Sequence, residues 1–448
     1  RGSRESRGSR EPRYRRCRAD VGRSAADQRH VCCNIDQPKV PLQIIPQRGT
    51  GTALLRCRFR IKEKEIEVNP IDKFEIIDII KEKACVSKQR HQGGISMTEM
   101  NEQWLKPVFF KRNRVFRVYL GGKLFHDFLG DAPEDGNEPE EWIASAVRAI
   151  NPGHTDPLEG LSLRVEDGKP FDQLLAEHPA EYLGDRKDLG VLVKFLDSAI
   201  RLPMQVHPTR DFSRQHFGSP YGKAEAWLIL ATRPDACIYF GFDRKVSKEE
   251  FAAAVERSEQ DKDAMTAFVN RVPVQTGDVF FVDAGVIHAI GAGCMLLEVQ
   301  EPTDFTIQPE YWCGDYHLNA QEMYLGLEKD IALDCFNFEL YGADVVTKAR
   351  KQPREKFRTE HVVAETLIGP EDTPCFSMER YCLNGGSITL EAPASIWICV
   401  DGEAVVQAED FEREIKTGDY FFLPAAAAGK CNVYCEKNAK IVCCMGGK

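Results

Sequence analysis

One stretch constrains the fold of this chain more than any other: residues 277–291, which have the sequence GDVFFVDAGVIHAIG. A run of apolar residues is followed by Gly285, and a second apolar run starts around His288. Branched and aromatic residues favour strands, and glycine permits the tight backbone turn that joins two strands. The stretch therefore predicts a strand, a turn and a returning strand, as in small antiparallel β-barrels.

Three residues in and before this stretch are candidate metal ligands. His207 lies in Gln205-Val206-His207-Pro208, Glu225 follows 18 residues later in the sequence GKAEAW, and His288 begins the returning strand. A single histidine in a strand is more often a packed or surface residue than a ligand. Imidazoles and a carboxylate together, however, suit zinc, iron or manganese. The three residues together predict one divalent metal ion in a small barrel.

The strand–turn pattern returns near the C-terminus. Residues 418–425 (GDYFFLPA) parallel residues 277–284 (GDVFFVDA), and in this alignment Gly429 falls where His288 stands. No histidine follows His361. A repeat of this kind indicates two copies of one fold. We expect residues 331–448 to form a second β-barrel without metal ligands, with a structural role.

Residues 1–96 differ from the rest in charge. They contain 22 Lys and Arg against 12 Asp and Glu, whereas the remainder contains 37 against 57. This basic segment could be a nucleic-acid arm, but it lacks interleaved aromatic residues and any binding motif. The first methionine is Met97. We therefore expect residues 1–96 to be a disordered or non-native extension, with the natural start at Met97 or Met100.

Composition excludes several classes of protein for the remainder. None of its apolar runs reaches the roughly 18 residues that a membrane helix needs, and no secretory signal pattern is present. The 16 cysteines of the whole chain are scattered without CxxC pairs, which favours free thiols in a reducing cytoplasm. The acidic remainder argues against nucleic acid as a partner, because phosphate backbones require clustered Lys and Arg. Oligomeric state is not predicted.

These motifs resemble type I mannose-6-phosphate isomerase, a zinc enzyme of the cupin superfamily. The similarity covers residues 104–448, and Glu141-Trp142-x-x-Ser145 is similar to an N-terminal stretch of the family. The resemblance implies a mainly β fold with helical insertions and two cupin (jelly-roll type) barrels. A metal-binding catalytic domain would then span residues 97–330. It also implies zinc ligands at His207, Glu225 and His288, with Gln205 as a further ligand in some members.

An aldose–ketose isomerase moves a proton between C1 and C2 of an open-chain sugar phosphate. Such chemistry needs a Lewis acid, a base and stabilisation of an enediol-like anion. Glu298 is the candidate base, on a strand expected to lie beside that of His288; the alternative is a hydrogen bond that supports a metal ligand. Lys223 should face the same side as Glu225, since strand side chains alternate, although a solvated surface lysine is the alternative. Arg201 and Arg210 are weaker phosphate candidates.

One position departs from the family pattern. The resemblance implies a catalytic arginine shortly after residues 297–300, but Gln308 occupies this place. Glutamine forms hydrogen bonds but carries no charge, so another cation could replace the arginine. The favoured function is interconversion of mannose 6-phosphate and fructose 6-phosphate, with Gln308 among the catalytic candidates. Two alternatives stay open: a sugar-phosphate-binding protein without turnover, and an iron-dependent cupin oxygenase.

Overall fold

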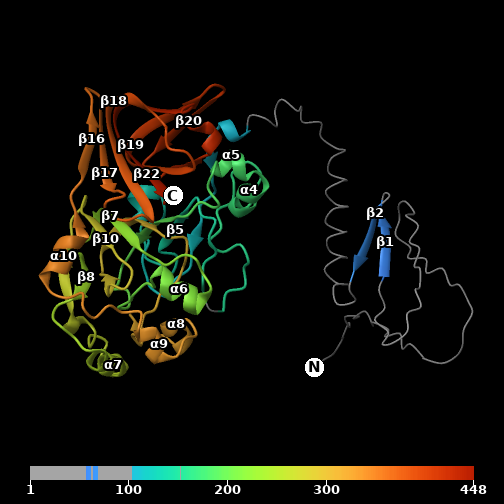
Figure 1. The fold of residues 1–448 in the computed structure, drawn as a ribbon. Helices are drawn as coiled ribbons and strands as arrows, with labels where there is room; N and C mark the ends of the chain where they lie inside the picture. The colour runs from blue at the N-terminus through green and yellow to red at the C-terminus, as the bar shows by residue number, and fades with distance from the viewer. Residues whose placement is uncertain (1–56, 62–63, 69–102, 152, 448) are drawn as a thin grey trace, which may run out of the picture. The chain divides into compact units, whose positions relative to one another are not determined.

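The computed structural model describes residues 57–61, 64–68, 103–151 and 153–447 (Figure 1). The chain divides into two compact units, residues 1–94 and 95–448. In the first unit, β1 (Cys57–Ile61) pairs antiparallel with β2 (Lys64–Val68). The other residues of the predicted extension lie outside the described part of the chain, so its assignment stays a prediction.

The second unit contains a seven-stranded antiparallel sheet in the order β15-β10-β7-β12-β6-β5-β4. Its strands are β4 (Arg114–Val115), β5 (Glu140–Ile143), β6 (Leu192–Asp197), β7 (Glu225–Thr232), β10 (Val279–Val282), β12 (Cys294–Gln300) and β15 (Arg350–Lys351). A three-stranded sheet in the order β11-β8-β9 accompanies it. Its strands are β8 (Cys237–Phe242), β9 (Val269–Pro273) and β11 (His288–Ile290).

The C-terminal half forms an eight-stranded sheet in the order β16-β17-β18-β22-β19-β21-β3, with β20 paired to β19. Its strands are β3 (Val108–Phe109), β16 (Arg354–Arg358), β17 (Val362–Ile368), β18 (Phe376–Thr389), β19 (Ser395–Ala408), β20 (Phe411–Lys416), β21 (Tyr420–Leu423) and β22 (Asn432–Gly446). The early strand β3 thus belongs to the late sheet. The predicted division at residue 330 stays a prediction.

Alternation along the strands of the seven-stranded sheet separates two cores. Trp227 and Ile229 of β7 pack in one cluster with Ile238 and Phe240 of the three-stranded sheet. The intervening Leu228 packs in another cluster, which contains side chains of both large sheets. Burial of both faces explains why these strands are apolar almost throughout. A polar side chain on the first face therefore lies between the two sheets of the first half.

The repeat predicted from residues 277–284 and 418–425 is present in the structure. Gly277 and Gly418 both have positive φ angles, of 95° and 89°. The carboxylate of each following aspartate, Asp278 or Asp419, accepts a hydrogen bond from the backbone N–H three residues earlier, at 3.0 Å in both cases. Each glycine turn leads into a strand, β10 or β21. The same turn chemistry thus starts equivalent strands in both halves.

Short helices connect the strands. They are α3 (Phe125–Leu129), α4 (Phe171–Glu177), α5 (Pro179–Leu183), α6 (Arg210–Phe217), α7 (Lys248–Arg257), α8 (Ala320–Tyr324), α9 (Lys329–Leu333) and α10 (Ala343–Ala349). Ser247 caps α7 by accepting a hydrogen bond from the backbone of Glu250. None of the described helices has the length and apolar character needed to cross a bilayer. The prediction of a mainly β fold with helical insertions is confirmed.

Candidate metal and substrate site

The three predicted ligands lie together between the sheets of the first half. The ligand atoms of His207, Glu225 and His288 are within 4.8 Å of one another, and all three side chains are buried. The two Nε2 atoms are 3.2 Å apart, and the Glu225 oxygens lie 3.1 Å from His207 Nε2 and 3.4 Å from His288 Nε2. Among the residues that the structure describes, these three form the one group of this kind.

Backbone pairing positions this triad. Gln205 and His288 exchange two backbone hydrogen bonds of 2.9 Å, which brings the segment of His207 beside β11. Gly285, at the turn before β11, donates its N–H to the carbonyl of His207. The 18-residue gap between His207 and Glu225 contains α6, which Thr209 caps through its side chain. The inserted helix therefore lets both ligands reach one site despite the long spacing.

Each histidine ring is oriented by a backbone carbonyl. Nδ1 of His207 lies 2.9 Å from the oxygen of Phe305, and Nδ1 of His288 lies 2.9 Å from the oxygen of Val286. A carbonyl oxygen only accepts, so each Nδ1 carries the proton and donates it. The unprotonated Nε2 atoms then face Glu225, as metal ligation requires. The donor set and its orientation fit a divalent metal.

Charges in the site favour the protonation states of a metal centre. Burial, with the nearby Lys223 ammonium, lowers the pKa of His207 to about 3. Burial also lowers the pKa of His288. Although burial opposes ionisation of Glu225, the nearby ammonium of Lys223 outweighs it and holds the pKa of Glu225 well below its usual range. Neutral imidazoles and an ionised carboxylate are the forms that bind metal.

Lys223 lies beside the triad, as the strand alternation predicted. Its Nζ is 2.6 Å from Glu225 Oε2 and 2.7 Å from His207 Nε2. The residue is 4% exposed, which excludes the alternative of a solvated surface lysine. Gln205 also lies at the triad, with its amide nitrogen 3.4 Å from His288 Nε2. Rotation of this amide about its last bond exchanges its nitrogen and oxygen, which would bring the oxygen toward the triad.

A cavity of about 140 Å³ lies next to the triad and is lined by Gln205, Lys223 and Glu298. The strand of Glu298 does not neighbour that of His288, contrary to expectation: β12 pairs with β6 and β7, whereas β11 pairs with β8. Glu298 nevertheless faces the site, because it is in register with Trp227, two residues along the same face from Glu225. Burial raises the pKa of Glu298 despite the nearby cation Lys194.

A row of buried charges extends from Glu298 along this cavity. Lys194 Nζ lies 3.2 Å from Glu298 Oε1 and 3.7 Å from Glu140 Oε2. Arg117 continues the row through hydrogen bonds to Glu140 and Asp304. Sequence reasoning missed these residues as cavity residues. The sequence does contain one indication for Lys194, because it is a lysine within the apolar strand Leu192–Asp197. A lysine in a buried strand is usually paired with an acidic group, which would have indicated a buried ion pair.

The remaining sequence candidates have different positions. Gln308 lines the cavity, and its amide nitrogen donates to the backbone carbonyl of Glu322 at 3.3 Å. Arg201 forms two hydrogen bonds, of 2.8 and 2.7 Å, with the buried carboxylate of Glu310. Arg210 contacts Glu301 at 2.5 Å. Neither arginine is among the residues lining this cavity, and each is paired with a carboxylate.

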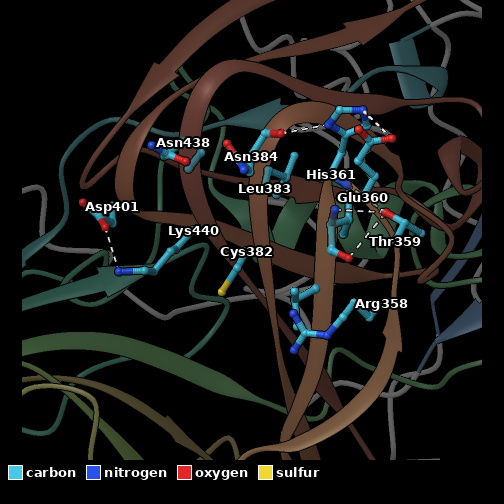
Figure 2. Close-up of a pocket in the computed structure, with 13 residues that line it drawn as sticks. Arg358, Thr359, Glu360, His361, Cys382, Leu383, Asn384, Asp401, Asn438 and Lys440 are labelled. Atoms are coloured by element: carbon cyan, nitrogen blue, oxygen red, sulfur yellow. Dashed lines mark hydrogen bonds and ion pairs between the residues drawn. The ribbon is translucent and has the colours of Figure 1, made fainter.

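A larger cavity, of about 510 Å³, lies in the C-terminal half (Figure 2). Its cationic side chains already have acidic partners: Lys440 pairs with Asp401, and Arg358 pairs with Glu355. Both cations are exposed. The His361 ring contacts the backbone oxygen of Asn384 (Figure 2). The larger cavity therefore has exposed charged side chains that are already paired, whereas the smaller cavity is lined by buried charged side chains beside the triad. The smaller cavity is the candidate site.

Comparisons with known proteins agree with this geometry. The family model of the mannose-6-phosphate isomerase cupin domain matches residues 369–435. The curated mannose-6-phosphate isomerase ManA of Bacillus subtilis is 30% identical over 326 residues, which cover 71% of this chain and 93% of that protein. The mannose-6-phosphate isomerase of Streptococcus mutans is 32% identical over 203 residues, and the match spans 45% of this chain and 59% of that protein.

Solved structures show the same fold. The crystal structure of the Bacillus subtilis mannose 6-phosphate isomerase has a TM-score of 0.59 at 22% identity, covering 75% of this chain and 99% of that one. A zinc-bound mannose 6-phosphate isomerase has a TM-score of 0.57 at 15% identity, covering 76% of this chain and 100% of that one. With the ManA match over nearly the whole relative, these findings place the chain in the mannose-6-phosphate isomerase family of the cupin superfamily.

Proposed function

We propose that the protein is a zinc-dependent isomerase that interconverts mannose 6-phosphate and fructose 6-phosphate. The observation that carries the proposal is the buried triad of His207, Glu225 and His288 beside a cavity lined by Lys223 and Glu298. Three protein ligands leave a position open for substrate, as in catalytic zinc sites. The zinc-bound relative and the family's named activity support the choice of metal and substrate.

The chain's own residues supply the remaining chemistry. A bound zinc ion would act as a Lewis acid toward the sugar carbonyl and its neighbouring hydroxyl. Glu298 takes a proton from one of the two carbons and returns it to the other, and its raised pKa moves it toward the range in which a carboxylate is an effective base. Its Oε1 is buried and forms an ion pair with Lys194, but it accepts no hydrogen bond from the described residues, so it can still accept one from a ligand.

Lys223 and Gln205 act at the metal end of the cavity. The Lys223 ammonium donates to the oxygen on which negative charge develops, because it is held at the edge of the triad. The Gln205 amide oxygen adds a further ligand when the amide is turned toward the metal. Gln308 stabilises the wall of the cavity, because its amide donates a hydrogen bond to the backbone carbonyl of Glu322. None of these roles requires a charge at position 308.

The test is a coupled assay of fructose 6-phosphate formation from mannose 6-phosphate, with zinc-loaded protein. Turnover that a chelator abolishes and zinc restores is the expected result. Folded, zinc-loaded protein that binds the sugar phosphate without turnover would instead show a binding protein, for which the neutral Gln308 is the supporting observation. Iron after anaerobic purification, together with oxygen uptake, would indicate an oxygenase.

We also propose a reducing, cytoplasmic location. The eleven cysteines whose side chains the structure describes are free thiols, and most of them are buried. Burial raises the pKa of several, to about 12 for Cys294 and Cys335, so these thiols are poor nucleophiles and resist oxidation. Labelling with a thiol reagent before and after unfolding tests whether these thiols are buried and reduced: labelling should require unfolding, and thiols that stay unlabelled after unfolding would be oxidised.

A further inference from the structure

The cationic side chains of the cavity occupy distinct places along it. Lys223 contacts the triad, and Lys194 lies between the carboxylates of Glu298 and Glu140. Arg117 lies beyond Glu140. Among the described residues that line the cavity, it is the single arginine. The sequence of contacts therefore places the guanidinium at the opposite end of the charged row from the metal triad.

The guanidinium of Arg117 is held in place before any ligand binds. Nε donates to Glu140 at 3.0 Å, Nη1 donates to Asn151 at 2.9 Å, and Nη2 lies 3.1 Å from both oxygens of Asp304. The side chain is 12% exposed. A guanidinium has five N–H donors, so at least one Nη1 donor is left after these contacts with the described residues. Arg117 thus combines a fixed orientation with a donor for a further acceptor.

The neighbouring position 308 does not provide such a group. Gln308 lines the same cavity but carries no charge, and its amide nitrogen is engaged with the backbone of Glu322. Arg117 reaches the segment that leads to Gln308 through its ion pair with Asp304. Guanidinium groups suit phosphate because two parallel N–H groups match two oxygens. In the part of the cavity near Asp304 and Gln308, the positive charge therefore comes from Arg117.

We infer that Arg117 binds the phosphate group of the substrate. The inference rests on the proposed function: with the reacting carbons at the metal triad, the phosphate of an open-chain hexose phosphate lies at the far end of the molecule. Asp304 occupies the Nη2 side of the guanidinium in the ligand-free protein. Phosphate therefore competes with Asp304 for Arg117, and the free Nη1 donor provides its first contact.

Calorimetric titration of the zinc-loaded protein with sorbitol 6-phosphate tests the inference. This open-chain sugar phosphate has no carbonyl group and cannot be isomerised, and sorbitol serves as the probe without phosphate. The variants are Asp304→Asn and the double variant Arg117→Gln with Asp304→Asn. The double variant removes both members of that ion pair, while the buried Glu140 keeps Lys194 as a cationic neighbour. Arg148→Gln is the control, because Arg148 is an exposed arginine paired with Asp172.

Asp304→Asn should bind sorbitol 6-phosphate more tightly than the wild type, because a competing carboxylate is lost. The double variant should bind it about tenfold more weakly than Asp304→Asn, as expected for one hydrogen bond to a charged group. The Arg148 control should match the wild type. A residue with a purely structural role would lose affinity in Asp304→Asn as well. Equal affinities in Asp304→Asn and the double variant would overturn the inference.

Arg117→Lys provides a second test if the double variant does not fold. Lysine keeps the charge beside Glu140 but lacks the two-pronged donor, so sorbitol 6-phosphate should bind several-fold more weakly, and unchanged affinity overturns the inference. Because binding is measured without turnover, the two proposals fail separately. Arg117-dependent binding by an inactive wild type would refute the isomerase, whereas an active wild type with Arg117-independent binding would refute the phosphate contact.

Discussion

Replacing Glu298 by glutamine isolates the proposed base. The substitution preserves size and removes the ionisable group from a side chain that is 3% exposed. Glu298 Oε1 lies 3.2 Å from Lys194 Nζ without a hydrogen bond, so the variant loses one ion pair while Lys194 retains Glu140. A positioned base contributes about 10²–10⁴-fold in rate, which corresponds to about 3–5 kcal/mol of activation free energy. We expect kcat to fall by this factor.

The assay is the coupled conversion of mannose 6-phosphate, with zinc content measured on the same sample. The matched control is Glu141→Gln, which changes an equally buried carboxylate one residue from Glu140. Glu141 faces away from the cavity and accepts hydrogen bonds from Arg114 and Tyr420. This control should lose stability, by about 1–3 kcal/mol for a partly broken buried network, yet its folded fraction should keep the wild-type kcat within about twofold.

Two results would contradict the reasoning. If Glu298→Gln retains kcat within tenfold of the wild type at full zinc content, Glu298 is not the base. If its loss of activity follows a loss of zinc instead, the carboxylate supports the metal site, which is the alternative considered from the sequence. A large loss of kcat in Glu141→Gln would show that burial of any carboxylate in this region, and not its position in the cavity, controls turnover.

Further predictions concern the metal, the pH profile and stability. His288→Ala should abolish stoichiometric zinc binding measured by atomic absorption, whereas full zinc content would exclude it as a ligand. The proposed base must be ionised to take a proton, and the pKa of Glu298 is raised. We therefore expect kcat/KM to fall as the pH decreases through a value above the ordinary glutamate range. A pH profile that stays flat down to pH 4.5 would argue against Glu298 as the base. Arg201→Met should lower the free energy of unfolding by about 3 kcal/mol, because Glu310 is then buried without its cation; denaturant titration tests this, and a change below 1 kcal/mol would contradict it.

Local sequence patterns predicted the elements of the site where strand periodicity alone decides direction. Lys223 precedes β7 by two residues, Glu225 is the first residue of β7, and both face one site, as the alternation of extended chain predicts. Ser247 caps the start of α7, which is a local effect too, because an N-cap acts through the next turn of backbone. Residues 266–273 form a 3-10 turn (Thr266–Phe268) followed by β9, where buried Val269 and Val272 pack in the core.

Strand order was not predictable in the same way. Glu298 was expected beside the strand of His288, but the turn at residues 291–293 separates two sheets, and β12 pairs with β6 and β7. Which strands pair depends on the packing of the whole chain, whereas which face a residue takes depends on its neighbours two positions away. Glu298 therefore faces the site for a different reason from the one expected.

The sequence by itself determined the turn and strand pattern, its repetition in the C-terminal half, and the three residues able to bind a metal ion. Each of these depends on residue type and short spacing. Only the tertiary structure assembled Arg117, Glu140, Lys194 and Asp304 into one buried row, because they come from segments up to 187 residues apart. Ion pairs between buried charges form only when folding has removed water and brought the partners within a few ångströms. A local sequence pattern does not show which distant residues will be brought together in this way.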